Sequence, residues 1–163
     1  MRSRRSPRRP GGALPCYAPS AGAIRDRVRA STVKGIALIG YITLGTNDLP
    51  RATAFYDALL AEMGVKRLME FGGRGYGWAA AIDQPMLCIM KPYDGRPATV
   101  GNGVMAGIAV DSRDKVDRIH AKALELGGSD EGPPGLRADG GEGFYAAYFR
   151  DPDGNKLDVF VYL

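Results

Sequence analysis

The chain has 163 residues and a formal net charge of +4 at pH 7, which leaves room for one domain with a single hydrophobic core. Residues 1–32 carry eight arginines and one aspartate, whereas acidic side chains outnumber basic ones in the rest. A mildly acidic body argues against a specific nucleic-acid ligand.

Cys16 and Cys88 are the only cysteines, so no disulfide framework is expected. No apolar run approaches the roughly 18 residues that span a bilayer, and we expect a cytosolic protein without a membrane partner.

Residues 1–32 are predicted to form a disordered basic tail. They are rich in Arg, Pro, Gly and Ser, a composition that cannot bury enough apolar area to offset the entropy lost on ordering. The tail loosely resembles an organelle transit sequence, but a natural start near Val33, where the folded pattern begins, is the simpler interpretation. The folded domain is therefore expected at 33–163.

The first half of this domain predicts a strand, a helix and three more strands. Residues 36–46 are β-branched and aromatic, as in a buried strand. Asn47 and Asp48 can cap a helix over about 50–63, and Gly64 can end it. Turns rich in glycine or containing proline then separate three strand-like runs, 65–71, 76–82 and 86–91.

The same order of elements recurs after a connector over 92–102. A strand is predicted over 103–110, and a helix begins at Asp111-Ser112 and ends at Gly127-Gly128. The segment 129–143 has little pattern and holds the next strand if there is one. Aligning Tyr41 with Met105 matches strand with strand and helix with helix at an offset of 64 residues. We infer an internal duplication, with modules at 36–92 and 103–163.

The chain ends in a predicted antiparallel hairpin. Runs over 144–149 and 156–161 flank the turn Asp151-Pro152-Asp153-Gly154-Asn155. Asp158 lies between Leu157 and Val159, in a strand that is otherwise apolar. A buried carboxylate needs a partner, a metal or a ligand, but Asp158 can equally point to solvent beside Lys156.

The paired modules resemble the vicinal oxygen chelate superfamily, the group of glyoxalase I, bleomycin-resistance proteins and extradiol dioxygenases. The similarity rests on IGYITLGTNDLPRATAFYDALLAEMG, which opens the first module, and on FYAAYFRDPDGNKLDVFVYL, which closes the second. It implies an α+β fold in which two βαβββ modules pair into a curved mixed-sheet cleft. Residues 94–103 also resemble a small bacterial glyoxalase-like subgroup. Members of the superfamily commonly pair modules within or between chains, so a homodimer is expected.

Metal-using members of this superfamily bind a divalent ion through residues in the first and last strands of each module. Position by position, the resemblance places Tyr41, Met105 and Asp158 there, together with Cys88 or Ile89, whose register stays open. Both usual histidine positions thus lack an imidazole, and a thioether is a poor ligand for such metals. No cofactor is therefore expected, and a divalent metal is disfavoured. The only histidine, His120, lies on the second predicted helix and is expected to be structural.

Two functions follow from this resemblance. The first is a metal-free protein that binds a small organic molecule in the cleft, with Tyr41, Met105, Cys88 and Trp78 as the pocket. The phenol of Tyr41, the thioether of Met105 and the carboxylate of Asp158 would together suit an amphiphilic or cationic ligand. Trp78 can equally belong to the core. The alternative is a metal-dependent glyoxalase-like lyase or isomerase in which Asp158 is the catalytic carboxylate. If Asp158 faces the cleft, burial should raise its pKa.

Overall fold

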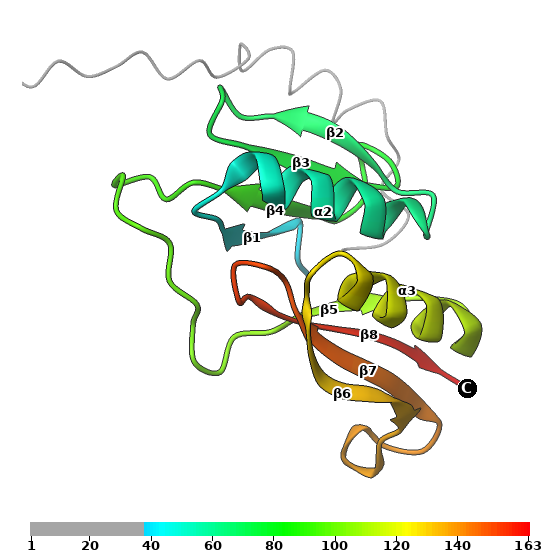
Figure 1. The fold of residues 1–163 in the computed structure, drawn as a ribbon. Helices are drawn as coiled ribbons and strands as arrows, with labels where there is room; N and C mark the ends of the chain where they lie inside the picture. The colour runs from blue at the N-terminus through cyan, green and yellow to red at the C-terminus, as the bar shows by residue number, and fades with distance from the viewer. Residues whose placement is uncertain (1–37) are drawn as a thin grey trace, which may run out of the picture. The chain divides into compact units, whose positions relative to one another are not determined.

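The computed structural model describes residues 38–163, and the predictions for the basic tail lie outside the described residues. Two βαβββ modules follow one another along the chain (Figure 1). The first contains β1 (Tyr41–Gly45), α2 (Leu49–Ala61), β2 (Lys66–Glu70), β3 (Gly75–Ala79) and β4 (Met86–Met90). The second contains β5 (Ala106–Ala109), α3 (Arg113–Glu125), β6 (Ser129–Leu136), a 3-10 turn η1 (Ala138–Gly140), β7 (Phe144–Arg150) and β8 (Lys156–Tyr162). The predicted α+β class and element order are confirmed.

Each module forms one four-stranded mixed sheet, and the two sheets have the same topology. The strand orders are β1-β4-β3-β2 and β5-β8-β7-β6. The first strand of each module pairs in parallel with its last strand, and the other pairings are antiparallel. Thr43 lies opposite Cys88, and Gly107 lies opposite Asp158. Thr43 and Gly107 are related by the same offset as Tyr41 and Met105, so the register agrees with the inferred duplication.

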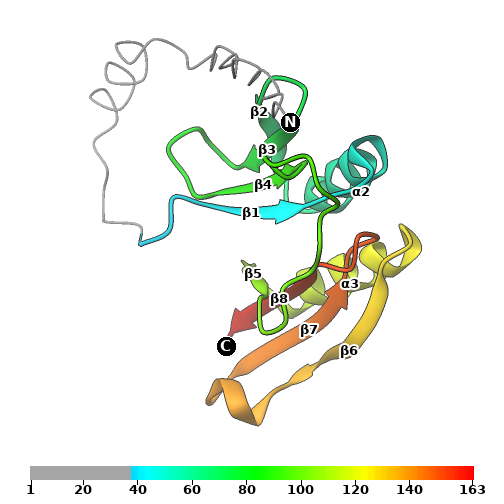
Figure 2. The ribbon, with the colours of Figure 1, turned by 90° about the vertical axis from the view of Figure 1, so that its left-hand side faces the viewer.

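One helix covers one face of each sheet (Figure 2). The Asp48 side chain caps α2 by accepting a hydrogen bond from the Arg51 backbone N–H at 3.1 Å. Gly64 follows the end of this helix with a φ of 71°, a conformation that glycine adopts without steric cost. Ser112 caps α3. The predicted helix start signals are thus used in both modules.

A continuous hydrophobic core joins the two modules. It includes Phe55 and Leu59 of α2, Ile89 of β4, Ile119 of α3 and Val159 of β8. These side chains recur every three or four residues in the helices and every second residue in the strands, which places them between helix and sheet. Each module alone would leave part of this core exposed, so the modules are expected to fold together.

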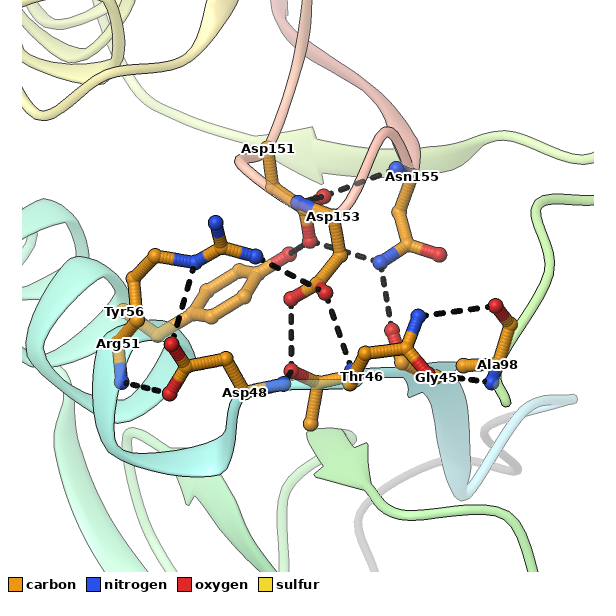
Figure 3. A network of polar contacts seen from close by, with 10 residues as sticks. Gly45, Thr46, Asp48, Arg51, Tyr56, Ala98, Asp151, Asp153 and Asn155 are labelled. Atoms are coloured by element: carbon orange, nitrogen blue, oxygen red, sulfur yellow. Dashed lines mark hydrogen bonds and ion pairs between the residues drawn. The ribbon is translucent and has the colours of Figure 1, made fainter. Parts of the chain in front are cut away.

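The turn Asp151-Pro152-Asp153-Gly154-Asn155 takes part in a hydrogen-bond network between the modules, which gives its polar side chains a structural role (Figure 3). The Tyr56 hydroxyl of α2 donates to Asp151 Oδ2 at 2.7 Å, and both side chains are buried. The same carboxylate accepts bonds from the Asn155 backbone N–H and side-chain amide, each at 2.8 Å. Burial, and then the charge of Asp151, raise the pKa of Tyr56 well above its ordinary value, which keeps this phenol a donor.

Asp153 and Asn155 attach the same turn to the end of β1. Asp153 accepts hydrogen bonds from Thr46 Oγ1 at 2.6 Å and from Arg51 Nη2 at 3.2 Å. The Asn155 amide donates to the Gly45 carbonyl at 2.9 Å. A turn of the second module thereby fixes the strand–helix junction of the first, which is a structural role for the motif.

The uncertain segment 129–143 contains a strand, β6, at the edge of the second sheet. Pro133 and Pro134 cannot donate to a ladder, and the register shifts between Gly132 and Gly135. An edge position tolerates both irregularities because only one side of the strand must pair.

No helix within residues 38–163 has the length and apolar character needed to cross a membrane. The cytosolic location stays a prediction.

Candidate functional site

The candidate site lies on the face of the first sheet that points away from α2. Strand alternation divides β4 between two environments. Leu87 and Ile89 pack against the core, whereas Met86, Cys88 and Met90 line a pocket on the other face. The register left open between Cys88 and Ile89 is thus settled, with Cys88 on the open face and Ile89 fully buried in the core.

This pocket has a volume of about 670 Å³. All of its lining residues belong to the first module and its following connector: Gly40, Tyr41, Thr43, Gly45, Met69, Phe71, Arg74, Ile82, Gln84, Met86, Cys88, Met90, Lys91, Pro92 and Tyr93. Apolar and aromatic side chains predominate, as in most small-molecule sites. The arrangement suits a compact organic ligand.

Methionine side chains form much of the pocket floor because glycines lie beside them. A Cβ at Gly77 would overlap Met86 Sδ, and a Cβ at Gly75 would overlap Met90 Sδ. β3 therefore leaves room for these thioethers to lie across the sheet. Thioethers are flexible and polarisable and pack well against aromatic rings, so this floor can adapt to a planar ligand.

Cys88 lies in this floor as a neutral thiol. It is buried, and burial raises the pKa of its thiol above the ordinary value. A reactive cysteine needs a depressed pKa. Cys88 is therefore suited to contact a ligand through its sulfur and unsuited to act as a nucleophile or as a thiolate ligand of a metal.

The pocket carries positive charge at one end. Among residues 38–163, Arg74 and Lys91 are the charged residues that line it, and Lys91 also lines a smaller pocket beside α2. They are neighbours across the β3–β4 edge, where Lys91 N–H donates to the Arg74 carbonyl at 2.8 Å. The Arg74 guanidinium lies 4.9 Å from the centre of the Tyr93 ring and donates to the Lys91 carbonyl at 3.3 Å. These contacts hold the guanidinium at the rim of the pocket.

Asp158 lies on the open face of the second sheet, outside this pocket. Its side chain is 4% exposed, and Oδ1 has no hydrogen-bond partner among residues 38–163. A Cβ at Gly107 would lie 2.9 Å from Oδ1, so only glycine leaves this carboxylate its space. Burial raises its pKa from 3.8 to about 6, although the charge of Lys156 lowers it. The solvent-facing alternative for Asp158 does not agree with this burial.

The structure brings together only part of the predicted pocket. Tyr41, which is 69% exposed, and Cys88 share the pocket of the first sheet. Met105 is 45% exposed and precedes β5 in the second module. Trp78 is buried on the opposite face, where its Nε1 donates to Asp57 of α2 at 2.9 Å. The core alternative for Trp78 is therefore the one that its position supports.

His120 has the structural position that its helix predicted. The ring is buried, with Nε2 2.9 Å from Asp130 Oδ1 and an edge directed at Phe149. Asp130 also accepts a bond from the Gly132 backbone N–H, and that bond, with the one from His120, lowers its pKa. This pair joins α3 to β6, and neither residue lines the pocket of the first sheet.

The residues that resemble metal-ligand positions form a poor donor set. They are the phenol of Tyr41, the thiol of Cys88, the thioether of Met105 and the carboxylate of Asp158, and no imidazole is among them. Within residues 38–163, no three His, Cys, Asp or Glu side chains cluster as they would around a metal. Divalent ions in open catalytic sites prefer imidazole nitrogen and carboxylate oxygen, so these residues do not fit one.

Comparisons with known proteins agree with this fold. The family model described as Glyoxalase/Bleomycin resistance protein/Dioxygenase superfamily matches residues 38–159. A glyoxalase/bleomycin resistance protein from Albidiferax ferrireducens T118 is 35% identical, with a TM-score of 0.68, over 77% of this chain and 98% of that one. No curated protein sequence matches the chain.

Two more distant solved structures share the fold alone. A glyoxalase/bleomycin resistance protein/dioxygenase family enzyme from Burkholderia phytofirmans PsJN is 16% identical, with a TM-score of 0.60, over 78% of this chain and all of that one (100%). Lactoylglutathione lyase from Agrobacterium tumefaciens is 22% identical, with a TM-score of 0.55, over 78% of this chain and 95% of that one. At these identities the likeness carries no information about the reaction.

Proposed function

Because the chain belongs to the Glyoxalase/Bleomycin resistance protein/Dioxygenase superfamily, we propose that it binds a small organic molecule on the open face of its first sheet. The observation that supports this proposal is the pocket of about 670 Å³. Ligand pockets typically measure about 300–1,000 Å³ and combine apolar walls with a few polar groups. The methionine floor supplies the apolar contact area, and the rim residues supply the polar groups.

The same proposal includes no catalytic metal. Cys88 stays protonated because burial raises its pKa, and Tyr41 would have to lose its phenolic proton to bind a metal. Met105 offers only a thioether, which leaves Asp158 as the one good oxygen ligand. The ligand would therefore be held by packing and hydrogen bonds.

We further propose that the protein is a homodimer. Tyr41 and Met105 are exposed on the open faces of the two sheets, and Tyr162 is also exposed. The pocket is lined by one module and its following connector, and members of this superfamily commonly pair modules within or between chains. A second copy that laid its second sheet over the first would bury these side chains and bring Met105 and Asp158 toward Tyr41 and Cys88.

A pocket-filling substitution tests the binding proposal. Thr43 is exposed and lines the pocket, so Thr43→Trp should occupy part of it without disturbing the core. N-phenyl-1-naphthylamine, a neutral fluorescent probe, should bind the wild type and lose about tenfold in affinity with Thr43→Trp, since each 1.4 kcal/mol of lost contact is a factor of ten. Thr99→Trp, in the exposed connector outside the pocket, is the control. Equal probe affinity in wild type and Thr43→Trp would contradict the proposal.

One observation favours a second candidate, the glyoxalase-like lyase or isomerase. Asp158 is a buried carboxylate whose Oδ1 has no partner in the described part of the chain, and burial raises its pKa to about 6. A carboxylate with this pKa can accept and return a proton near neutral pH. A divalent ion retained in stoichiometric amount by freshly purified protein without a histidine tag, and lost in Asp158→Asn, would favour this candidate over binding alone.

A further inference from the structure

We propose that the pocket of the first sheet is selective for an organic anion, an aromatic or conjugated molecule that carries one carboxylate or a similar group. This inference rests on the proposed function, because it names the class of ligand that the same pocket takes. It differs from the amphiphilic or cationic ligand expected when Asp158 was placed in the pocket. The charges that line the pocket carry the argument.

The charged groups of the pocket are both cations. Arg74 and Lys91 line it, and no Asp or Glu of the described residues does. Among residues 38–163, neither of them forms an ion pair. The acidic residue next to this rim along the chain, Asp94, pairs with Arg96 at 3.4 Å. The positive charge of the pocket is therefore not neutralised within the described part of the chain.

The two cations belong to neighbouring residues of the rim. Lys91 and Arg74 are joined by a backbone hydrogen bond between neighbouring strands, and Lys91 also lines a smaller pocket beside α2 that includes Asp57. An anion bound at the rim would attract the Arg74 guanidinium and draw the Lys91 ammonium toward it. A guanidinium and an ammonium around one carboxylate form short, charge-assisted hydrogen bonds.

Arg74 is held ready for such a contact. The Tyr93 ring lies under its guanidinium, and one Nη2 bond goes to the Lys91 carbonyl. An arginine has five donor N–H groups in a planar fork, so this bond leaves others for a ligand. A side chain fixed before binding loses less entropy when the ligand arrives.

The rest of the pocket accounts for the apolar part of the ligand. The Met86 and Met90 thioethers lie over Gly77 and Gly75, and Phe71 also lines the pocket. Thioethers and aromatic side chains make favourable contacts with aromatic rings. A ring over this floor would direct an attached carboxylate toward the rim.

Asp158 does not reverse this preference. It lies on the second sheet and is absent from the lining of the pocket. If a second copy brings its Asp158 toward the pocket, two cations still outnumber one carboxylate. The expected ligand keeps a single negative charge.

Two fluorescent probes with the same rings test the inference. 8-Anilinonaphthalene-1-sulfonate carries a sulfonate, and N-phenyl-1-naphthylamine lacks it. We expect the wild type to bind the sulfonate probe about tenfold more tightly, because one charge-assisted hydrogen bond contributes about that factor. Lys91→Gln and Arg74→Gln should each weaken the sulfonate probe and leave the neutral probe unchanged. Added salt should weaken only the sulfonate probe.

The controls separate this inference from the proposed function. Arg74→Lys retains the charge and should keep part of the preference, and Lys66→Gln, on the exposed strand β2 and outside the pocket, should change neither probe. Equal affinity of the two probes in the wild type, or sulfonate binding that survives both glutamine substitutions, overturns the anion preference. If Thr43→Trp changes the affinity of neither probe, the pocket is not the binding site, and the proposed function is contradicted as well.

Discussion

Removal of the Asp158 charge should stabilise the protein at neutral pH. The folded-state pKa is about 6 and the ordinary value is 3.8, and burial is the cause. The folded protein therefore holds the proton more tightly than the unfolded chain, and stability falls as pH rises from about 4 to about 6. Above pH 6 the full penalty applies, at about 3 kcal/mol for about two pKa units.

Asp158→Asn should recover part of this penalty. The amide keeps the shape of the side chain, but it too would be buried without a partner, which costs about 1–2 kcal/mol. We therefore expect a gain of about 1–2 kcal/mol in the free energy of unfolding at pH 7.5, measured by urea denaturation. At pH 4 Asp158 is itself protonated in the folded state and most of its penalty is gone, so the burial cost of the amide remains and Asp158→Asn should lower the free energy of unfolding by about 1 kcal/mol.

The difference between the two pH values is the decisive quantity. Asp83→Asn, in an exposed turn, is the matched control and should change the free energy of unfolding at neither pH. A loss of stability in Asp158→Asn at pH 7.5 would show that the carboxylate has a favourable partner, such as a metal ion. An equal effect at both pH values would refute the argument from burial.

Three further predictions concern the fold and the assembly. Tyr56→Phe should lower the free energy of unfolding by about 1–3 kcal/mol, because it removes a buried hydrogen-bond donor to the charged Asp151. Tyr93→Phe, at an exposed position, is the control and should have little effect. Equal losses of stability in the two variants would contradict the role of the network in Figure 3. A chain beginning at Val33 should melt at the same temperature as the full chain, and a large drop would show that residues 1–32 stabilise the domain. Sedimentation at micromolar concentration should give a dimer, and monomer alone would remove this expectation.

The elements of the fold could be predicted because their signals are local. Asp48 and Ser112 cap helices, and Gly64 follows the end of α2 with a positive φ, as expected. The sequence offset between Tyr41 and Met105 agrees with the strand register. These features depend on neighbours within a few residues, or on a repeat visible in the sequence.

The composition of the pocket could not be predicted in the same way. Residues 86–90 are all apolar, so no alternation in the sequence shows which of Cys88 and Ile89 faces the core. In the strand that holds Trp78, the open face carries Gly75 and Gly77. The sequence therefore lacks the alternation of polar and apolar side chains that would show which face is open. Only the tertiary contact with Asp57 fixes Trp78 in the core.

The cations of the rim gave no signal in the sequence. Arg74 lies in a glycine-rich turn and Lys91 at the end of a strand, and both positions usually hold solvated charges. Arg74 and Lys91 lie side by side only because β3 pairs with β4 in antiparallel orientation. The separation of Asp158 from Tyr41 within one chain likewise depends on how two sheets pack, which no local pattern specifies.

Methionine methyl signals offer the most direct test of metal-free ligand binding in the pocket. The protein contains six methionines, of which Met69, Met86 and Met90 line the pocket while Met63 packs against the core. N-phenyl-1-naphthylamine is titrated into protein labelled with ¹³C at the methionine methyls, with a chelator present. Our account predicts that the signals of the three pocket methionines shift while that of Met63 does not. Shifts confined to methionines outside the pocket, or shifts that appear only after a divalent metal is restored, would contradict it.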